Sequence, residues 1–307
     1  MAARWERPWD GAEPGHRRSK RREGGVVLSA VIDLHTHSTA SDGRSTPAEL
    51  MVEAARAGID VLGLTDHDTI AGWEEAAGQV EATGVALVRG MELSAKIDGI
   101  SVHILGYLFD PDDERLTAHV ARMLAERRDR AVQMVARLAR DVPVTWEAVE
   151  AHAGAATPVG RPHIADALID SGVVADRQEA FAVYLRPGSP YYIHHYAPPA
   201  AEAVEWISDA GGKAVMAHPA ASRRGKTVSL SRIEELADAG LFGLEVDHRD
   251  NVDREELAKL AERRGLVRTG SSDYHGTGKT NRLGENTTAR EVLDAISSGT
   301  YLEVLKP

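Results

Sequence analysis

The residues that could do chemistry in this 307-residue chain are histidines and carboxylates that follow short apolar runs. The first run leads into Asp33-Leu-His35-Thr-His37. Side chains two apart on a strand share a face, so His35 and His37 project together. The same residue types accompany the later runs, at Asp66-His67, Glu92, His103, His218, Glu245 to His248 and Asp273 to His275, and Asp42 lies in a turn after the first run. Clustered carboxylates repel and buried imidazoles lose solvation, so such a set is costly unless a cation binds it.

This mixture of imidazoles and carboxylates indicates a metal centre. Such ligands suit Mn, Fe, Zn or Ni. The set exceeds what one ion needs, so we expect two or three divalent ions, with Mn, Fe or Zn as the first candidates. Taken alone, His103 would fit a satisfied core histidine, so the prediction depends on the recurrence of these residues after apolar runs. The chain has no cysteine, which excludes thiolate ligands, disulfides and a cysteine nucleophile.

Short apolar runs alternate with helical stretches from residue 26 to about 110, and again from 213 to 273. Continuous apolar runs are typical of parallel strands covered on both faces. Repeated strand–helix units indicate an α/β fold with a parallel sheet, open or closed into a barrel. In such a barrel the active site lies at the carboxyl ends of the strands, so the histidines and carboxylates would meet on one rim.

Two segments depart from this alternation. Residues 110–195 contain mostly amphipathic helical stretches, which predicts a helical insertion into the α/β core. Residues 1–25 are polar, rich in Arg, Gly and Pro, and lack the apolar stretch of a secretory signal, so we predict a disordered tail. Residues 26–307 would then form the functional domain.

The charge narrows the range of partners. The chain holds 36 Lys and Arg against 47 Asp and Glu, a net charge of −11, which argues against long nucleic acid because its binding needs many basic contacts. No apolar run approaches the ~18 residues of a membrane span, so we expect no membrane partner. A small phosphorylated molecule or a short oligonucleotide stays compatible, because bound cations set the local potential. A cysteine-free chain fits a reducing compartment, and we expect a cytoplasmic protein.

These motifs resemble those of the PHP family, the polymerase and histidinol phosphatase group of metal-dependent phosphoesterases. The matching segments are D-L-H-T-H-S-T-A-S-D-G (33–43), G-L-T-D-H-D-T (63–69), G-M-E-L-S (90–94), V-H-I-L-G-Y (102–107), A-H-P (217–219) and G-S-S-D-Y-H-G (270–276). The resemblance covers about residues 30–305. It implies a distorted (β/α)7 barrel with the metals at the rim formed by the carboxyl ends of the strands.

Carried over position by position, the resemblance implies nine metal ligands. His35, His37, Glu92 and Asp273 would hold the first metal, Glu92, His103 and His218 the second, and Asp42, His67 and His275 the third. No position of this set departs from the family pattern.

The predicted insertion contains two further motifs, G-R-P-H-I-A (160–165) and Y-L-R-P-G-S-P-Y-Y (184–192). They resemble stand-alone PHP phosphoesterases that remove the 3′-phosphate of 3′,5′-bisphosphonucleotides or trim short RNA from its 5′ end, using metal-activated hydroxide. The resemblance implies that Arg161 contacts a substrate phosphate, with Arg186 as a weaker candidate. From the residues alone, Arg161 could also be a helix N-terminal residue beside a proline.

Two residues outside the ligand set, His248 and Asp66 beside His67, could orient water or donate a proton to the leaving oxygen. The alternative for each is to support the ligand imidazoles. Histidinol phosphate is an alternative substrate, because its hydrolysis uses the same metals. A non-catalytic metal- or nucleotide-binding regulator is a second alternative, which the intact ligand set argues against. The sequence has no P-loop motif and no G-x-G-x-x-G after a strand.

Overall fold

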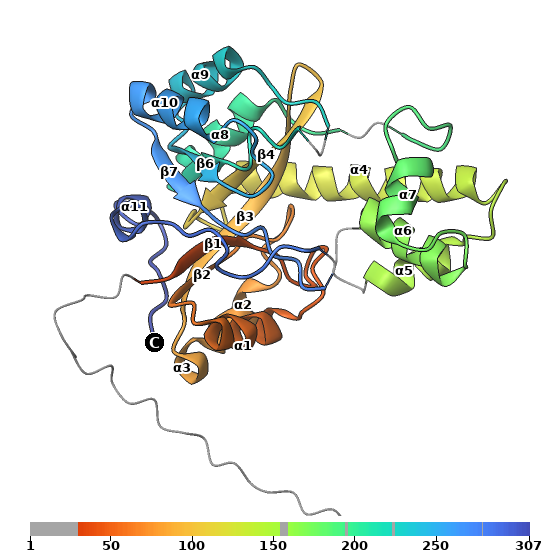
Figure 1. Cartoon of the computed structure of the whole chain (residues 1–307), viewed down its shortest axis with the longest axis horizontal. Helices are drawn as coiled ribbons and strands as arrows, with labels where there is room; N and C mark the ends of the chain where they lie inside the picture. Colours follow the sequence, from red (N-terminus) through yellow and green to blue (C-terminus); the bar gives the residue numbers. More distant parts are fainter. Residues whose placement is uncertain (1–29, 154–158, 194–195, 223–224, 278) are drawn as a thin grey trace, which may run out of the picture.

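The computed structural model describes residues 30–153, 159–193, 196–222, 225–277 and 279–307 (Figure 1). The tail predicted at residues 1–25 lies outside the described residues. The remainder contains a single seven-stranded sheet, surrounded by helices and followed on one side by a group of helices that extends away from it.

The seven strands follow one another in chain order, and the sheet curls into a nearly closed barrel. They are β1 (Ile32–Thr36), β2 (Val61–Leu64), β3 (Ala86–Ile97), β4 (Ile100–Tyr107), β5 (Lys213–Met216), β6 (Gly243–Asp247) and β7 (Val267–Gly270). The two edges approach each other just after β7, where Thr36 bridges Tyr274 and the His37 amide donates to the Tyr274 carbonyl at 2.9 Å. The predicted distorted (β/α)7 barrel is confirmed.

Strand β4 runs antiparallel to both of its neighbours, so the expectation of a parallel sheet is wrong at this strand. Asp98 and Gly99 join β3 to β4 in a two-residue turn with φ of 50° and 77°, and a tight hairpin requires two such positive angles. An apolar run carries no direction, so the sequence pattern did not separate a hairpin from a strand–helix unit. His103 consequently reaches the rim from the first half of β4, opposite Ser94, and not from a carboxyl end.

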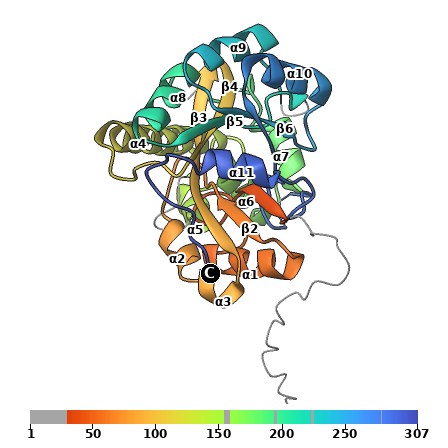
Figure 2. The ribbon, with the colours of Figure 1, turned by 90° about the vertical axis from the view of Figure 1, so that its left-hand side faces the viewer.

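Helices cover the outside of the barrel, because their apolar faces pack against the apolar strands (Figure 2). They are α1 (Pro47–Ala57), α2 (Trp73–Ala77), α3 (Val80–Thr83), α8 (Ala200–Asp209), α9 (Leu230–Asp238), α10 (Arg254–Arg264) and α11 (Arg290–Ile296). The ends of α1 follow from its sequence. Thr46 and Glu49 form a capping box at its start, and Gly58 ends it with φ of 80°.

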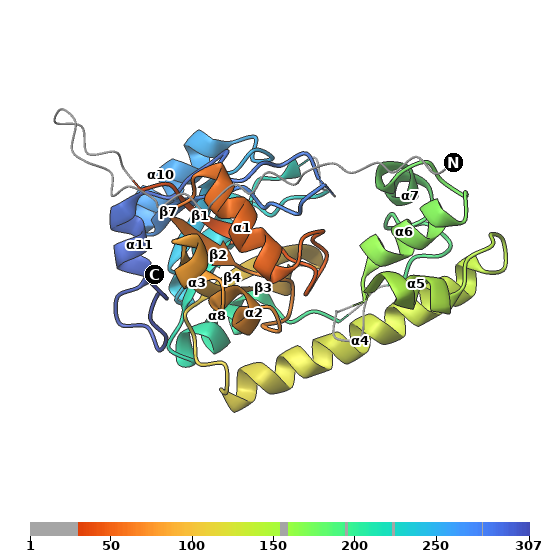
Figure 3. The same ribbon diagram turned by 90° about the horizontal axis from the view of Figure 1, so that it is seen from below.

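Between β4 and β5 the chain forms a helical lobe, which comprises α4 to α7 and the turn that follows as far as residue 193. Its helices are α4 (Glu114–Leu138), α5 (Trp146–Ala153), α6 (Arg161–Asp170) and α7 (Arg177–Val183). Figures 1 and 3 show α4 running away from the barrel, with α5 to α7 at its far end. The lobe has an apolar core of its own that includes Leu138, Ile164 and Leu185.

None of the helices in the described ranges combines the length and the apolar character that a membrane span requires.

Candidate metal centre

The nine predicted ligand residues come together at one rim of the barrel. Three groups of them have ligand atoms within 4.8 Å of one another, namely His35, His37, Glu92 and Asp273; His67, Glu92 and His103; and His37, Asp42, His67 and His275. His218 joins through its Nε2 atom, 3.2 Å from Glu92 Oε1. We call these nine residues the metal-ligand cluster. They come from β1, β3, β4 and the segments that follow β1, β2, β5 and β7.

Glu92 lies at the centre of the cluster and is fully buried. Its Oε1 atom is 2.6 Å from Nδ1 of His103 and 3.2 Å from Nε2 of His218. Its Oε2 atom is 3.0 to 3.2 Å from nitrogen atoms of His35, His37 and His67. A carboxylate with imidazoles on both oxygens is placed to be shared between two ions.

Asp42 and His275 form the outer side of the cluster. Nε2 of His275 lies 3.1 Å from Oδ1 of Asp42. The same oxygen is 3.8 Å from Nδ1 of His37 and 4.0 Å from Nε2 of His67. One carboxylate oxygen therefore faces three imidazoles, which is the composition of a further cation site.

Several buried ligand atoms in the cluster form no hydrogen bond with any described residue. They are Asp42 Oδ1, His67 Nδ1, Glu92 Oε2 and His275 Nε2. Buried polar atoms are normally hydrogen-bonded, so four such atoms in one place indicate a binding site. Nitrogen and oxygen ligands without sulfur suit Mn, Fe or Zn, and the residues fit divalent metal ions.

Two carboxylates of the cluster, Glu92 and Asp42, favour the ionised form. Burial alone would raise the pKa of Glu92, but the neighbouring His67 and His103 lower it well below its ordinary value. Burial also opposes charge on Asp42, and the imidazoles of His275 and His67 lower its pKa well below the usual range. The ionised form is the one that binds metal.

Glu245 has a role that the sequence pattern did not specify. Its Oε1 atom is 2.9 Å from Nδ1 of His35, and its Oε2 atom accepts from the His218 amide at 2.8 Å. Burial would raise the pKa of Glu245, but His35 lowers it to about 2. A charged carboxylate on Nδ1 orients the ring so that Nε2 faces the cluster. The sequence feature that points to Glu245 is its position at the end of an apolar run.

Asp273 is held on both of its oxygens. Oδ1 lies 3.2 Å from Nε2 of His37, on the cluster side. Oδ2 accepts from Nζ of Lys279 at 3.1 Å and lies 3.8 Å from Nε2 of His248. Nδ1 of His248 accepts from the Asp250 amide at 3.1 Å, so a neutral His248 ring carries its proton on Nε2, toward the cluster.

Asp66 is buried behind the loop that follows β1, and both of its oxygens are engaged. It accepts hydrogen bonds from the amide and hydroxyl of Ser38 at 2.8 and 2.7 Å, and from the hydroxyl of Ser41 at 2.6 Å. Burial raises the pKa of Asp66. These contacts hold the loop that carries His37 and Asp42, which fits the supporting role for Asp66.

Arg161 begins α6 and is fixed by the turn after α7. Its Nη1 atom donates to the Leu185 carbonyl at 3.1 Å. Its guanidinium lies 5.1 Å from the ring centre of Phe181 and 5.7 Å from that of Tyr192. These contacts hold the plane of the guanidinium while leaving other N–H groups for a ligand. Arg186 is exposed and does not line the same cavity.

Arg130, on α4, is a residue that the sequence reasoning missed. It is buried, 5.0 Å from the ring centre of Tyr192, and its Nη2 atom forms no hydrogen bond with a described residue. Burial and the charge of Arg161 lower the pKa of Arg130 to about 10, so it stays charged at neutral pH. In the sequence it looks like one more charge on an amphipathic helix.

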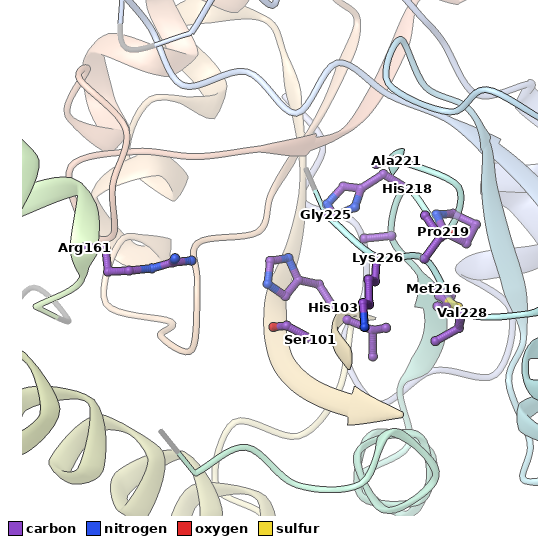
Figure 4. A pocket seen from close by; sticks show the side chains of 13 residues that line it. Ser101, His103, Arg161, Met216, His218, Pro219, Ala221, Gly225, Lys226 and Val228 are labelled. Carbon is purple, nitrogen blue, oxygen red and sulfur yellow. The ribbon is translucent and has the colours of Figure 1, made fainter. Parts of the chain in front are cut away.

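A cavity of about 230 Å³ lies beside the metal-ligand cluster (Figure 4). Arg161 enters it from the helical lobe, and Lys226 lines the opposite side, on the segment after β5. His103 and His218 form the wall between them. The cavity therefore joins the metal ligands to a cation from the lobe.

Comparisons with known proteins agree with this geometry. Residues 33–152 match the PHP domain family. A 3′,5′-nucleoside bisphosphate phosphatase of Chromobacterium violaceum is 36% identical over 256 residues, covering 82% of this chain and 90% of the relative. A 5′-3′ exoribonuclease of Haemophilus influenzae is 35% identical over 275 residues, covering 88% and 97%.

A solved structure from Bifidobacterium adolescentis, assigned as a metal-dependent phosphoesterase, has a TM-score of 0.83 to this chain. It is 40% identical and covers 86% of this chain and 94% of its own. A match over this share of the chain includes both the barrel and the helical lobe. The chain belongs to the PHP domain family and is a metal-dependent phosphoesterase.

Proposed function

We propose that the chain hydrolyses phosphate esters of small nucleotides, either 3′,5′-bisphosphonucleotides or the 5′ ends of short RNA. The observation that carries this proposal is a single cavity with metal ligands on one wall and Arg161 on another. A substrate with two phosphates would place one at the cluster and the other at the arginine, which binds phosphate with paired N–H donors. The names of the two relatives, a bisphosphate phosphatase and an exoribonuclease, fit such a substrate.

The nine residues of the metal-ligand cluster would hold two or three divalent ions, with Mn, Fe or Zn as the candidates. In the division proposed here, His35, His37, Glu92 and Asp273 would hold the first ion, Glu92, His103 and His218 the second, and Asp42, His67 and His275 the third. Such ions, when bound, lower the pKa of water, offset the phosphate charge and clamp the attacking and leaving oxygens. Glu245 and Lys279 keep His35 and Asp273 in their orientations.

The other residues of the chain bind the substrate and handle a proton. Arg161 presents its fork to phosphate oxygens, and the rings of Phe181 and Tyr192 hold it in place. Arg130 adds a second positive charge behind it. Nε2 of His248 holds a proton beside Asp273 and can give it to the leaving oxygen or orient a water molecule.

Two alternatives, histidinol phosphate hydrolysis and a non-catalytic regulator, fit the site less well. Histidinol phosphate carries one phosphate and a cationic amine, and Arg161 and Arg130 would repel that amine. A non-catalytic regulator would not need a complete ligand set with its supporting contacts at Glu245 and Lys279. With nucleotides and short RNA as substrates, the proposed reaction would take place in the cytoplasm.

A phosphate-release panel on purified protein tests this function. The substrates are a 3′,5′-bisphosphonucleotide, 5′-phosphorylated RNA oligomers and histidinol phosphate, each with Mn²⁺, Fe²⁺ or Zn²⁺. We expect turnover of the nucleotide substrates and at least ~100-fold lower kcat/KM for histidinol phosphate, since it lacks the phosphate that Arg161 would bind and carries a cationic amine instead. Preferred hydrolysis of histidinol phosphate, or turnover of nothing in the panel, would refute the proposal.

A further inference from the structure

The cavity beside the metal-ligand cluster has a second cationic end. Figure 4 shows Arg161 on one side of His103 and Lys226 on the other. Lys226 belongs to the segment between β5 and α9, and Thr227 next to it also lines the cavity. The metal ligands therefore lie between two positive groups that come from different parts of the fold.

The lining of this cavity favours an anion at both ends. Among its described lining residues there is no carboxylate, and its ionisable groups besides the imidazoles are Arg161 and Lys226. This is unusual in a chain of net charge −11. Several other surface cations pair with carboxylates, as Lys259 does with Glu255. Lys226 is exposed and has no carboxylate within ion-pair distance in the described ranges of the chain.

Beyond Lys226 the cavity lining is apolar. Met216, Pro219 and Val228 line it there, on the side of Lys226 away from His103 (Figure 4). A cation with apolar surface beside it suits a phosphate that is attached to a nucleoside.

In the proposed function, a bisphosphonucleotide would make no use of Lys226, because its two phosphates would occupy the metal-ligand cluster and Arg161. An RNA fragment continues past the scissile bond to a further phosphodiester. We propose that Lys226, with the hydroxyl of Thr227, binds the phosphodiester that follows the scissile one when a short 5′-phosphorylated RNA is bound. This inference rests on the proposed function and adds a residue that would favour RNA over a bisphosphonucleotide. A single cation at this end fits an oligomer of a few nucleotides, since long nucleic acid requires many basic contacts.

The test compares wild type, Lys226→Ala and Lys306→Ala as full-length, Mn²⁺-loaded protein. Lys306 is an exposed lysine near the C-terminus that does not line this cavity. The substrates are a 3′,5′-bisphosphonucleotide, a 5′-phosphorylated dinucleotide and a 5′-phosphorylated trinucleotide. Only the trinucleotide has a phosphodiester beyond the scissile one, so only its hydrolysis should depend on Lys226.

We expect Lys226→Ala to lower kcat/KM for the trinucleotide by about 3- to 10-fold. The other two substrates should stay within about twofold, and Lys306→Ala should match wild type on all three, because no phosphate contact changes. The log–log dependence of trinucleotide kcat/KM on salt should also become shallower by ~0.7, the slope of one lost contact to single-stranded nucleic acid.

Two results would overturn the inference while leaving the proposed function intact. One is an equal effect of Lys226→Ala on all three substrates, or no effect on any of them. The other is a wild-type protein that hydrolyses the bisphosphonucleotide but neither RNA. A wild-type protein that hydrolyses none of the three would instead refute the proposed function.

Discussion

Glu92 connects the metal-ligand cluster, because its two oxygens lie between imidazoles from β1, β4 and the segments after β2 and β5. The substitution Glu92→Gln keeps the shape of the side chain and removes its charge. We expect the variant to lose at least one metal ion per chain and its phosphate release to fall by more than ~100-fold, because the loss of a direct ligand exceeds that of a supporting contact. Metal analysis and a phosphate assay check this.

The matched control is Glu303→Gln, which changes an exposed carboxylate outside the cluster in the same way. It should keep both metal content and activity. If Glu92→Gln retained the wild-type metal content and rate, the assignment of Glu92 as a shared ligand would be wrong.

The proposed contact between Arg161 and a substrate phosphate can be tested by substitution. Arg161→Lys keeps the charge but removes the paired donors and the stacking on Phe181 and Tyr192. We expect KM for the nucleotide substrate to rise by about tenfold, with metal content unchanged. Arg140→Lys, at an exposed position, provides the control. Unchanged kinetics for Arg161→Lys would remove this residue from the substrate site.

Site residues could be predicted from the sequence where a short local pattern marks them. His35 and His37 stand two apart after an apolar run, so their chemistry and shared direction could be read together. Glu245 could not be assigned a role, because its partner His35 lies 210 positions away in the chain. Arg130 was missed because its burial depends on Tyr192, which only the folded lobe brings to it.

At the scale of elements, the helical lobe contacts the rim of the barrel through partly buried ion pairs. Arg127 on α4 donates to Asp68 at 2.6 Å. Asp166 on α6 accepts from Arg44 at 2.7 Å and from Arg177 at 2.7 and 2.8 Å. Asp68 is next to the predicted ligand His67, and Arg44 is two residues from the predicted ligand Asp42, so the lobe packs against loops that carry residues of the metal-ligand cluster.

The carboxylate of Asp166 joins the lobe to the loop after β1. Asp166→Asn leaves Arg44 and Arg177 without their anionic partner. We expect the free energy of unfolding to fall by about 2–3 kcal/mol, since Asp166 is buried while Arg44 is partly exposed. Urea denaturation measures it. Asp209→Asn, which breaks an exposed pair with Arg115, should cost less than ~1 kcal/mol. Equal costs for the two variants would contradict the anchoring role.

The same carboxylate predicts a pH dependence. Burial would raise the pKa of Asp166, but Arg177 and Arg44 lower it below its ordinary value. A lowered carboxyl pKa contributes stability above the unfolded-state pKa of ~3.9, and this contribution disappears as the pH falls through the folded-state value. The stability difference between wild type and Asp166→Asn should therefore be constant near neutral pH and shrink below about pH 4. A constant difference at all pH values would count against the ion pair.

Most elements could be predicted because each has a local signature. Thr46, Glu49 and Gly58 fix the ends of α1 through capping, and the apolar period marks α4. The direction of β4 could not be predicted in this way, because the same apolar run fits either direction and only the short Asp98-Gly99 turn distinguishes them. Because of that turn, His103 reaches the rim from the first half of an antiparallel strand and not from the carboxyl end of a parallel one.

At the scale of the whole molecule, an acidic chain has a cavity whose lining contains two cationic side chains and no carboxylate among its described residues. Arg161 and Lys226 line it at either side of the metal ligands. The α/β barrel could be predicted from the sequence because its strands are locally apolar and its site residues follow them. The packing of the lobe on the rim could not, because it depends on ion pairs between positions more than 50 residues apart, such as Arg127 with Asp68.

Metal binding should also stabilise the whole chain. Ions that bind the folded protein and not the unfolded one raise its stability by mass action. We expect the Tm of the chelator-treated protein to rise by several degrees when Mn²⁺ is added, and Glu92→Gln to show a smaller rise. Thermal scans with and without Mn²⁺ measure this. An unchanged Tm for the wild-type protein would contradict a metal centre at the rim.

The central claim is that the nine-residue cluster binds several divalent ions that hydrolysis requires. The most direct measurement is the metal content per chain of the purified protein, taken together with nucleotide hydrolysis before chelation, after chelation and after metal is restored. The account predicts two or three ions per chain, loss of activity with the chelator and recovery with Mn²⁺, Fe²⁺ or Zn²⁺. A protein that hydrolyses the nucleotide at full rate without bound metal would contradict it.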